Sequence, residues 1–457
     1  MHSHQRFTTI ASTIVLAGLS PDAGRTQPLQ AEPTTTQVWQ ARVLPLPGRL
    51  GQTLVFNSNS PEEVLNPGIL LSTLPGGGHG LGVAFNGRFS VFSHHIAKDN
   101  APGQRLLYLG LLAHNPSGTD LRLKRLSGAS YLSQPDALFR SLPAVMPDAD
   151  GMIFAGPGDR TTTELLHGRS PLAPTTWHLP AKRTTLLDAF PIPTSVAILP
   201  PINGRSTLMH MHTNGPIYLS EVACFARKDP QGGWQTPTQA DFERVLASRT
   251  LVFPRDVAGS VVRAEGPQLP NFRYGRVAGV SVGDRLSAQL PLPKPNETLA
   301  FPIASVALNR WGTEAIQSAA LKARYPDTAH QAHGNYAVLY DLTLPLANPS
   351  QRTNDIVFSL THPLRTEASR RVVFQSPPAR ATTFRGTLKL AWALTGDRTH
   401  QTFTHIVLRQ GENPGPFATL TLPAGARGTA RLSLIYPADA TPPQLLLIEN
   451  RPESPRD

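Results

Sequence analysis

One short stretch decides the fold class of this chain: Tyr108-Leu-Gly-Leu-Leu-Ala-His-Asn115-Pro-Ser117. An apolar run ends there in an Asn-Pro-Ser turn, where the asparagine side chain and the preset φ of proline both favour a reversal of the chain. The phrase returns as Tyr340-Asp-Leu-Thr-Leu-Pro-Leu-Ala-Asn348-Pro-Ser350, and a second strand-like run follows each turn. The stretch therefore predicts strand–turn–strand units that occur twice.

Short β-rich runs alternate with Pro, Gly and Asn turns along nearly the whole chain. The 45 prolines and 36 glycines among 457 residues argue against long helices, because proline breaks helix interiors. The clearest predicted strands are Phe89–Ile96, Leu106–Ala113, Leu121–Leu126, Ile217–Phe225, Val338–Leu346 and Ile356–Leu360. We predict an all-β protein with two tandem antiparallel β-sandwiches, Ig-like or jelly-roll-like.

Two further echoes follow in the same order. Pro157–Gly168 resembles Pro378–Gly386, and Leu179–Pro191 resembles Leu422–Pro437. Each phrase alone could be common turn sequence, but three in register favour a duplicated domain. The predicted organisation is a signal peptide (1–31), a first sandwich (44–227), a connector (228–271), a second sandwich (272–450) and a tail (451–457).

The connector contains the one segment that the sequence firmly predicts as a helix, Gln239–Ser248. Thr238 with Asp241 three residues later forms a capping-box pattern at its start. Phe242, Val245 and Leu246 then fall on one face, as in an amphipathic helix.

The N-terminus has the pattern of an export signal. Met1–Arg6 is followed by the uncharged, largely apolar segment Phe7–Leu19, which has the length of a signal-peptide core. Ala31 is a fair cleavage position, and a disordered tail is the alternative reading. Later apolar runs are all shorter than 18 residues, so we expect a soluble or peripheral mature protein without a transmembrane segment, exported to the periplasm or beyond.

The charge balance is basic, with a formal net charge of +11, and only seven of the 42 Lys and Arg residues are lysines. Such a surface favours anionic partners. The chain has no run of five or six basic residues, so we expect an acidic polysaccharide or another envelope component rather than nucleic acid. Cys224 is the single cysteine, which excludes an intrachain disulfide.

Two motifs suggest chemistry at first sight. Gly279-Val-Ser-Val-Gly283 fits a hydrolase nucleophile elbow, but that elbow needs a helix after the serine and Pro-Leu-Pro follows Leu290, so Ser281 is expected on a strand. His210 and His212 would share one face of a strand and could begin a metal site, which would need a third ligand such as His94, His95 or His333. Surface or hydrogen-bonded histidines are the simpler expectation, and we expect no metal and no cofactor.

Several phrases resemble the cyanobacterial domain-of-unknown-function 3370 family of exported proteins. The matching phrases span nearly the whole chain and are Val55–Pro61, Gly68–Thr73, Tyr131–Asp136, Ala155–Arg160, Asn203–Met209, Tyr274–Gly279, Arg324–Thr328 and Ala332–Tyr336. The resemblance implies export and a cyanobacterial source, and it implies no catalytic residues. His210 stands where a basic residue would be expected.

Polar residues in or beside the turns of these phrases are the candidate ligand-binding residues: Asp159, Arg160, Arg205, Asp327, His333, Asn335 and Tyr336. Such side chains can recognise a sugar or a carboxylate, or they can bond loop backbone and fix the sandwich ends. We expect a non-enzymatic structural or interaction protein of the cell envelope. The alternative is an envelope hydrolase with a loop-built site at the domain junction, which an acid–base or nucleophile–base contact among Asp159, His94, His95 and His333 would favour.

Overall fold

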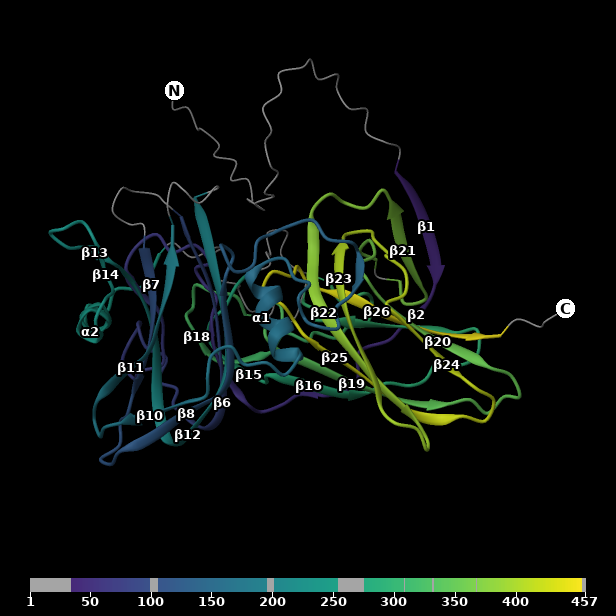
Figure 1. Cartoon of the computed structure of the whole chain (residues 1–457), viewed down its shortest axis with the longest axis horizontal. Helices are drawn as coiled ribbons and strands as arrows, with labels where there is room; N and C mark the ends of the chain where they lie inside the picture. Colours follow the sequence, from purple (N-terminus) through teal and green to yellow (C-terminus); the bar gives the residue numbers. More distant parts are fainter. Residues whose placement is uncertain are drawn as a thin grey trace, which may run out of the picture.

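The computed structural model describes most of the chain after the N-terminal segment: residues 34–98, 106–194, 201–253, 275–307, 309–330, 333–366 and 368–453. The all-β prediction is confirmed, since two β-sandwiches lie side by side with only two helices among the described residues (Figure 1). The expected signal peptide lies outside the described residues. Within them, no helix has the length and apolar character needed to cross a membrane.

The first sandwich is one ten-stranded sheet that folds into two layers. One layer has the order β10-β8-β12-β6-β4-β15-β18, and β5, β7 and β11 form the other. The strands are β4 (Leu54–Ser58), β5 (Gly68–Ser72), β6 (Phe85–Lys98), β7 (Leu106–His114), β8 (Leu121–Leu132), β10 (Thr175–Leu179), β11 (Thr184–Pro193), β12 (Ile202–Phe225), β15 (Ala278–Val282) and β18 (Ala320–Arg324).

The long strand β12 connects the two layers. Its first half pairs with β6 and β8, and after a register break between Thr213 and Ile217 its second half pairs with β5 and β7. Buried side chains of both layers meet in one core, including Leu123 and Met209 from one layer and Leu111 from the other. The strand therefore closes a sandwich around a shared apolar interior.

The second sandwich consists of two separate sheets. Their orders are β3-β16-β19-β25-β22-β23-β9 and β2-β17-β26-β20-β24. The strands are β2 (Arg42–Val43), β3 (Arg49–Leu50), β9 (Val145–Pro147), β16 (Arg285–Gln289), β17 (Thr298–Ile303), β19 (Leu339–Ala347), β20 (Asn354–Thr361), β22 (Thr382–Leu394), β23 (His400–Arg409), β24 (Ala418–Leu422), β25 (Arg427–Ile435) and β26 (Gln444–Pro452). Phe301, Phe358 and Ile448 from one sheet pack against Leu388 and Leu432 from the other.

The two sandwiches share a strand order. The five-stranded sheet β2-β17-β26-β20-β24 has the same order as β4-β6-β12-β8-β10 in the first sandwich. In both, the first two strands run parallel and the other pairs run antiparallel. The pair β7–β11 has a counterpart in β19–β25.

The two Asn-Pro-Ser turns make the same contacts in the two sandwiches. Asn115 Nδ2 donates to the carbonyl oxygen of Leu179 at 2.9 Å, and Asn348 Nδ2 donates to that of Leu422 at 2.8 Å. Ser117 Oγ and Ser350 Oγ each donate to the preceding asparagine Oδ1 at 2.7 Å. The sequence echoes at these turns therefore lie on equivalent strand ends.

The second of the three echoes, Pro157–Gly168 and Pro378–Gly386, does not lie on equivalent elements. Pro157–Gly168 contains helix α1 (Pro157–Leu166), whereas Pro378–Gly386 runs into strand β22. The sequence analysis did not predict this helix. The sheets also cross the expected domain boundaries, because β2, β3 and β9 join the second sandwich, and β15 and β18 join the first.

Helix α2 (Gln239–Ala247) confirms the helix predicted in the connector. Thr238 Oγ1 accepts from the amide of Asp241, and the Asp241 carboxylate accepts from the amide of Thr238, which completes the capping box. The helix packs on β7, where Phe242 lies over Gly110 and would be 2.4 Å from a Cβ at that position. Only glycine leaves room for this ring.

Two short ribbons complete the chain. Strand β1 (Thr35–Gln40) pairs with β21 (Arg371–Ser376) at the edge of the second sandwich, and β13 (Arg227–Lys228) pairs with β14 (Trp234–Gln235) near α2 (Figure 1). Helix α1 lies between the two sandwiches and contacts β8 and β12 of the first and β22 and β25 of the second.

Candidate functional site

Helix α1 carries the first two candidate residues, and it is held from both sandwiches. The Asp159 side chain is fully buried, and its Oδ2 accepts from the amide of Ala155 and from His405 Nε2, both at 2.8 Å. The Asp439 Oδ2 accepts from the amides of Gly158 and Asp159 at 3.0 and 3.3 Å. Burial raises the pKa of Asp439, and the nearby Asp159 acts in the same direction. These contacts fasten the helix to the second sandwich.

Arg160 and Arg205 are engaged on the side of the first sandwich. The Arg160 guanidinium lies 4.0 Å from the ring centre of Tyr131 and donates to the carbonyl oxygen of Asp136. Arg205 is buried and donates to the carbonyl oxygen of Pro191 at 3.0 Å and to Ser130 Oγ at 2.9 Å. Burial lowers the pKa of Arg205 to about 10. Both arginines therefore hold local structure; Arg205 is buried and Arg160 is partly exposed.

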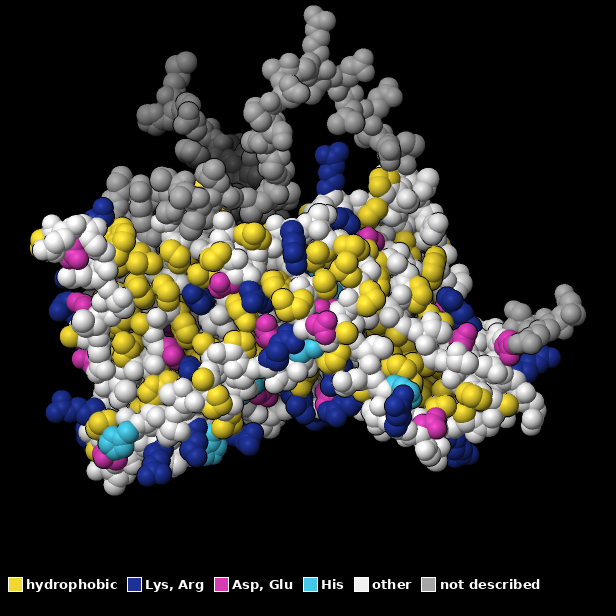
Figure 2. All heavy atoms as spheres, viewed as in Figure 1, with side chains coloured by type: hydrophobic (Ala, Val, Ile, Leu, Met, Phe, Trp, Pro, Cys, Tyr) yellow, Lys and Arg dark blue, Asp and Glu magenta, His cyan; other side chains and the backbone are white. Residues whose placement is uncertain are grey.

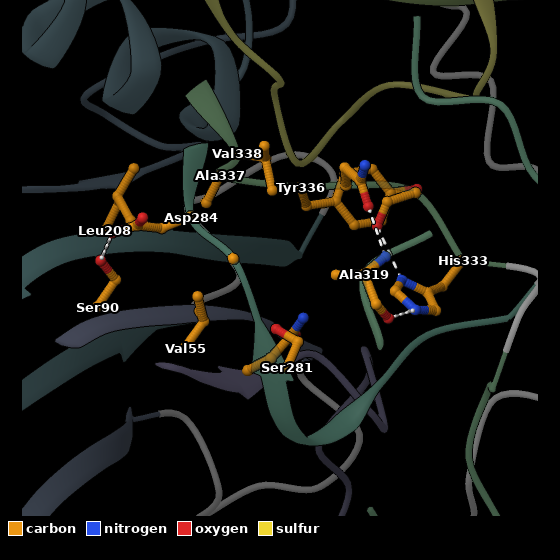
Figure 3. Close-up of a pocket in the computed structure, with 14 residues that line it drawn as sticks. Val55, Ser90, Leu208, Ser281, Asp284, Ala319, His333, Tyr336, Ala337 and Val338 are labelled. Carbon is orange, nitrogen blue, oxygen red and sulfur yellow. Dashed lines mark hydrogen bonds between the residues drawn. The ribbon is translucent and has the colours of Figure 1, made fainter. Parts of the chain in front are cut away.

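Three other candidates, His333, Asn335 and Tyr336, line a small crevice between the sandwiches (Figure 3). The ring nitrogens of His333 lie 3.0 and 3.1 Å from the carbonyl oxygens of Gly334 and Ala319. Asn335 Oδ1 accepts from the amide of Ala319 at 2.9 Å, and Tyr336 Oη donates to the carbonyl oxygen of Ala440 at 3.0 Å. Each of these three side chains is thus hydrogen-bonded to another part of the protein.

The remaining candidate, Asp327, is not among the residues that line this crevice. It lies in the turn after β18, beside Arg324. Burial lowers the pKa of Arg324, and the Asp327 carboxylate offsets part of this effect by raising it. The seven candidates therefore fall in three places, and the structure does not bring them together into one site. Their role in ligand binding stays a prediction.

Ser90 and Asp284 lie on the opposite wall of the crevice, and His210 lies beside Ser90. Ser90 Oγ donates to Asp284 Oδ2 at 2.8 Å (Figure 3). The same oxygen lies 3.0 Å from His210 Nδ1. The serine proton is directed to the carboxylate, and the serine lies between the other two groups. A hydrolytic triad needs the histidine between serine and carboxylate, so this arrangement does not activate Ser90. Ser281 lies on β15, as the sequence predicts.

A nucleophile–base contact of the kind that the hydrolase alternative requires exists in the first sandwich. Ser58 Oγ lies 3.0 Å from His95 Nε2, and His95 Nδ1 lies 2.8 Å from the carbonyl oxygen of Pro61. Ser58 and His95 each have no solvent-accessible surface. His94 Nδ1 lies 2.7 Å from Ser206 Oγ and is also buried. A substrate would reach these groups only if the strands around them opened.

A basic surface lies on the outer side of the β10-β8-β12-β6-β4 layer. Strand β8 alternates buried Leu121 and Leu123 with exposed Arg122 and Lys124. Lys124 lies opposite His212 on β12, and His212 lies opposite Arg88 on β6. We call Arg88, Arg122, Lys124 and His212 the basic face, and Lys124–His212–Arg88 its cross-strand row.

The cations of this face have no acidic partner. Arg88, Arg122 and Lys124 are exposed, and none of them forms an ion pair with a carboxylate in the part of the chain that the structure describes. Figure 2 shows Lys, Arg and His side chains along the lower border of the first sandwich, where β8, β10 and β12 lie in Figure 1. Arg122 and Lys124 lie two residues apart on one face of β8, and His212 on β12 separates Lys124 from Arg88. Like charges placed this close repel one another.

Sequence reasoning found only part of the basic face. It placed His210 and His212 on one side of a strand, and both do lie on the outer side of β12. The alternation of apolar and basic residues also places Arg122 and Lys124 on one side of a strand. The pairing that brings Lys124 and Arg88 next to His212, however, joins strands that are far apart in the chain. Among the described residues, no group of three His, Cys, Asp or Glu side chains is placed to hold a metal ion.

The fold and this surface define a double β-sandwich protein with a basic outer face. A profile described as "Protein of unknown function (DUF3370)" matches residues 41–450, so the chain belongs to that family. No curated protein matches the chain. A solved structure of cowpea mosaic virus top component, naturally occurring empty particles, aligns at 9% identity over 83% of this chain and 91% of that chain, with a TM-score of 0.12. A score this low gives no basis for comparing the two folds.

Proposed function

We propose that this chain is an exported, non-enzymatic interaction protein of a cyanobacterial cell envelope, and that it binds an acidic glycan or another anionic envelope component through the basic face. The single observation that carries the proposal is the set of three exposed cations, Arg88, Arg122 and Lys124, without a carboxylate partner. An anionic ligand would relieve their mutual repulsion on binding.

The chemistry of the face suits a polymer that carries repeated negative charges. The guanidinium groups of Arg88 and Arg122 can each pair with two oxygens of a carboxylate or sulfate, and Lys124, on the same strand as Arg122, adds a point charge. These cations lie on an exposed part of the strand surface, so a chain-like ligand can reach them without entering a pocket. The export signal expected at Phe7–Leu19 would bring the protein to a compartment with such polymers.

Retention of the purified protein on an immobilised acidic polysaccharide, with a neutral glycan as reference, tests the proposal. Retention should fall steeply with added salt, because the Debye length shortens from about 10 Å at 0.1 M to about 3 Å at 1 M. The double variant Arg88→Gln/Lys124→Gln should elute at clearly lower salt than the wild type. Arg352→Gln/Arg398→Gln is the matched control, since it removes two exposed cations from the second sandwich.

Two outcomes would contradict this function. Absence of retention at low salt would remove the binding proposal, and equal losses in the two double variants would show that net charge alone drives retention. Retention on duplex DNA that exceeds retention on the polysaccharide would point to nucleic acid instead.

The hydrolase alternative rests on the contact between Ser58 and His95. Turnover of a glycan or ester library that is lost in Ser58→Ala would favour the hydrolase. Loss of turnover in Asp159→Ala or His333→Ala, with the fold retained, would place such a site at the junction. Because Ser58 and His95 are fully buried, the binding function is better supported.

A further inference from the structure

We propose that the cross-strand row Lys124–His212–Arg88 is a subsite for one tetrahedral oxyanion, a sulfate or phosphate group carried on the anionic polymer. The inference rests on the proposed function and adds the chemical class of the group that is recognised. Arg122, one step further along β8, would contribute long-range attraction but would lie outside the subsite.

The register of three adjacent strands places these side chains together. Lys124 on β8 lies directly opposite His212, and Arg88 on β6 lies directly opposite His212 from the other side. Directly opposite residues have their Cβ atoms about 4.5–5.5 Å apart. The long Lys124 and Arg88 side chains can therefore extend over the shorter imidazole from both sides and meet one group above it.

The fold itself does not require cations at these positions. The second sandwich has the same strand order, and its matching row is Val357 on β20, Glu449 on β26 and Thr298 on β17. The register is equivalent, because Lys124 pairs with Thr176 on β10 as Val357 pairs with Thr419 on β24. This sheet therefore tolerates neutral or acidic residues in the row, so we attribute the basic row of the first sandwich to recognition of an anionic ligand.

The carboxylates that flank the basic face have other partners. Asp120, which precedes β8, lies 2.9 Å from His178 Nε2 and also accepts from the amide of Ala181. Asp284 accepts from Ser90 Oγ at the junction end of the face. Neither ion-pairs with Lys124 or Arg88 within the described residues, so the positive charge of the row stays available for an external anion.

The geometry of the donors favours a tetrahedral group over a carboxylate. A sulfate or phosphate ester presents three terminal oxygens in three directions, whereas a carboxylate presents two oxygens in one plane. Three donor side chains that approach from three strands match the first arrangement. Arg88 can bind two oxygens through its fork, with Lys124 and His212 on the third.

Dextrans with one backbone and different substituents test this subsite: dextran sulfate, dextran phosphate and carboxymethyl dextran at equal substitution, with plain dextran as the neutral reference. The affinity of the wild type for the sulfated or the phosphorylated polymer should exceed that for the carboxymethyl polymer by about tenfold, the equivalent of one charge-assisted hydrogen bond. The sulfate and phosphate arms identify which ester is preferred, and inorganic sulfate and phosphate serve as competitors.

The variants separate the row from the rest of the face. Lys124→Gln and His212→Asn should bring the ratio of affinities close to one. Arg122→Gln is the matched control: it should weaken binding to all three charged polymers and keep the ratio. Circular dichroism verifies that each variant is folded.

Two outcomes overturn the subsite and remain distinct from each other. Equal affinity of the wild type for all three charged polymers, or equal effects of Lys124→Gln and Arg122→Gln, would overturn the subsite while the proposed function stands. Absence of binding to every charged polymer would overturn both.

Discussion

Asp159 Oδ2 lies 2.8 Å from His405 Nε2, and this contact joins helix α1 to strand β23 of the second sandwich. Both side chains are fully buried. Thr163 on the same helix donates to Thr387 Oγ1 on β22 at 3.0 Å, and Asp439 accepts from the first amides of the helix. A short helix from the first half of the chain is thus bound by side chains of the second half, and these contacts connect the two sandwiches.

Asp159→Ala should destabilise the protein by about 3–5 kcal/mol, because it leaves His405 Nε2 and the amide of Ala155 buried without partners. Chemical denaturation, monitored by tryptophan fluorescence and circular dichroism, measures this change. Asp150→Ala is the control, since Asp150 is exposed in the loop before α1. A loss below about 1 kcal/mol in Asp159→Ala would show that the contact does not fasten the helix.

The sequence predicts the strand ends well because their signals are local. Asn115 and Asn348 each accept a hydrogen bond from the amide two residues later, inside their own turn. The Asn-Pro-Ser pattern therefore predicts the turn without help from distant residues. The same holds for Thr238 and Asp241 at the start of α2. In each case the residues that make the contacts lie within a few positions of one another.

Helix α1 has only weak local signals, which are Pro157 at its start and Asp159 in its first turn. Thr161, Thr162 and Thr163 are β-branched and favour strands, and Gly156 caps the helix without a side-chain hydrogen bond. The stabilising groups, such as Asp439 and His405, come from the other end of the chain. The basic face is hidden for the same reason, because only the tertiary pairing of β6, β12 and β8 brings Arg88, His212 and Lys124 into one row.

We propose that the two sandwiches arose by duplication, and the equivalence of the Asn115 and Asn348 turns leads to a prediction. Each asparagine side chain is buried and bonds the carbonyl oxygen of an equivalent leucine. Asn115→Ala and Asn348→Ala should therefore lower the free energy of unfolding by similar amounts, about 1–3 kcal/mol each. Urea denaturation of both variants makes the comparison, and a neutral result for one of them would argue against equivalent roles.

Acidification should destabilise the protein through His362. Its Nδ1 lies 2.7 Å from Thr383 Oγ1, and burial lowers its pKa from 6.5 to about 4. Between these values the unfolded chain binds a proton that the folded protein does not. The free energy of unfolding is therefore unaffected by protonation of His362 above pH 6.5, and it decreases as the pH falls from 6.5 toward 4.

A full shift of this size corresponds to about 3 kcal/mol. Denaturation midpoints between pH 7 and pH 4.5 measure the slope, and His362→Asn should make it shallower because asparagine does not titrate. His333 and His210 also have lowered pKa values through burial, so a residual slope is expected in the variant. An unchanged slope in His362→Asn would contradict the assignment.

Export is the last prediction, and it rests on the apolar segment Phe7–Leu19. The mature protein should begin between about Leu19 and Pro33, and such a cleavage would leave β1 intact, because this strand begins at Thr35 and pairs there with Ser376. Mass spectrometry of the N-terminus of the native protein locates the cleavage. Leu16→Arg should interrupt the apolar core and leave the precursor uncleaved inside the cell, whereas Gln37→Arg, an exposed change in β1, should be processed normally. Recovery of wild-type protein from the cytoplasm with Met1 intact would refute export.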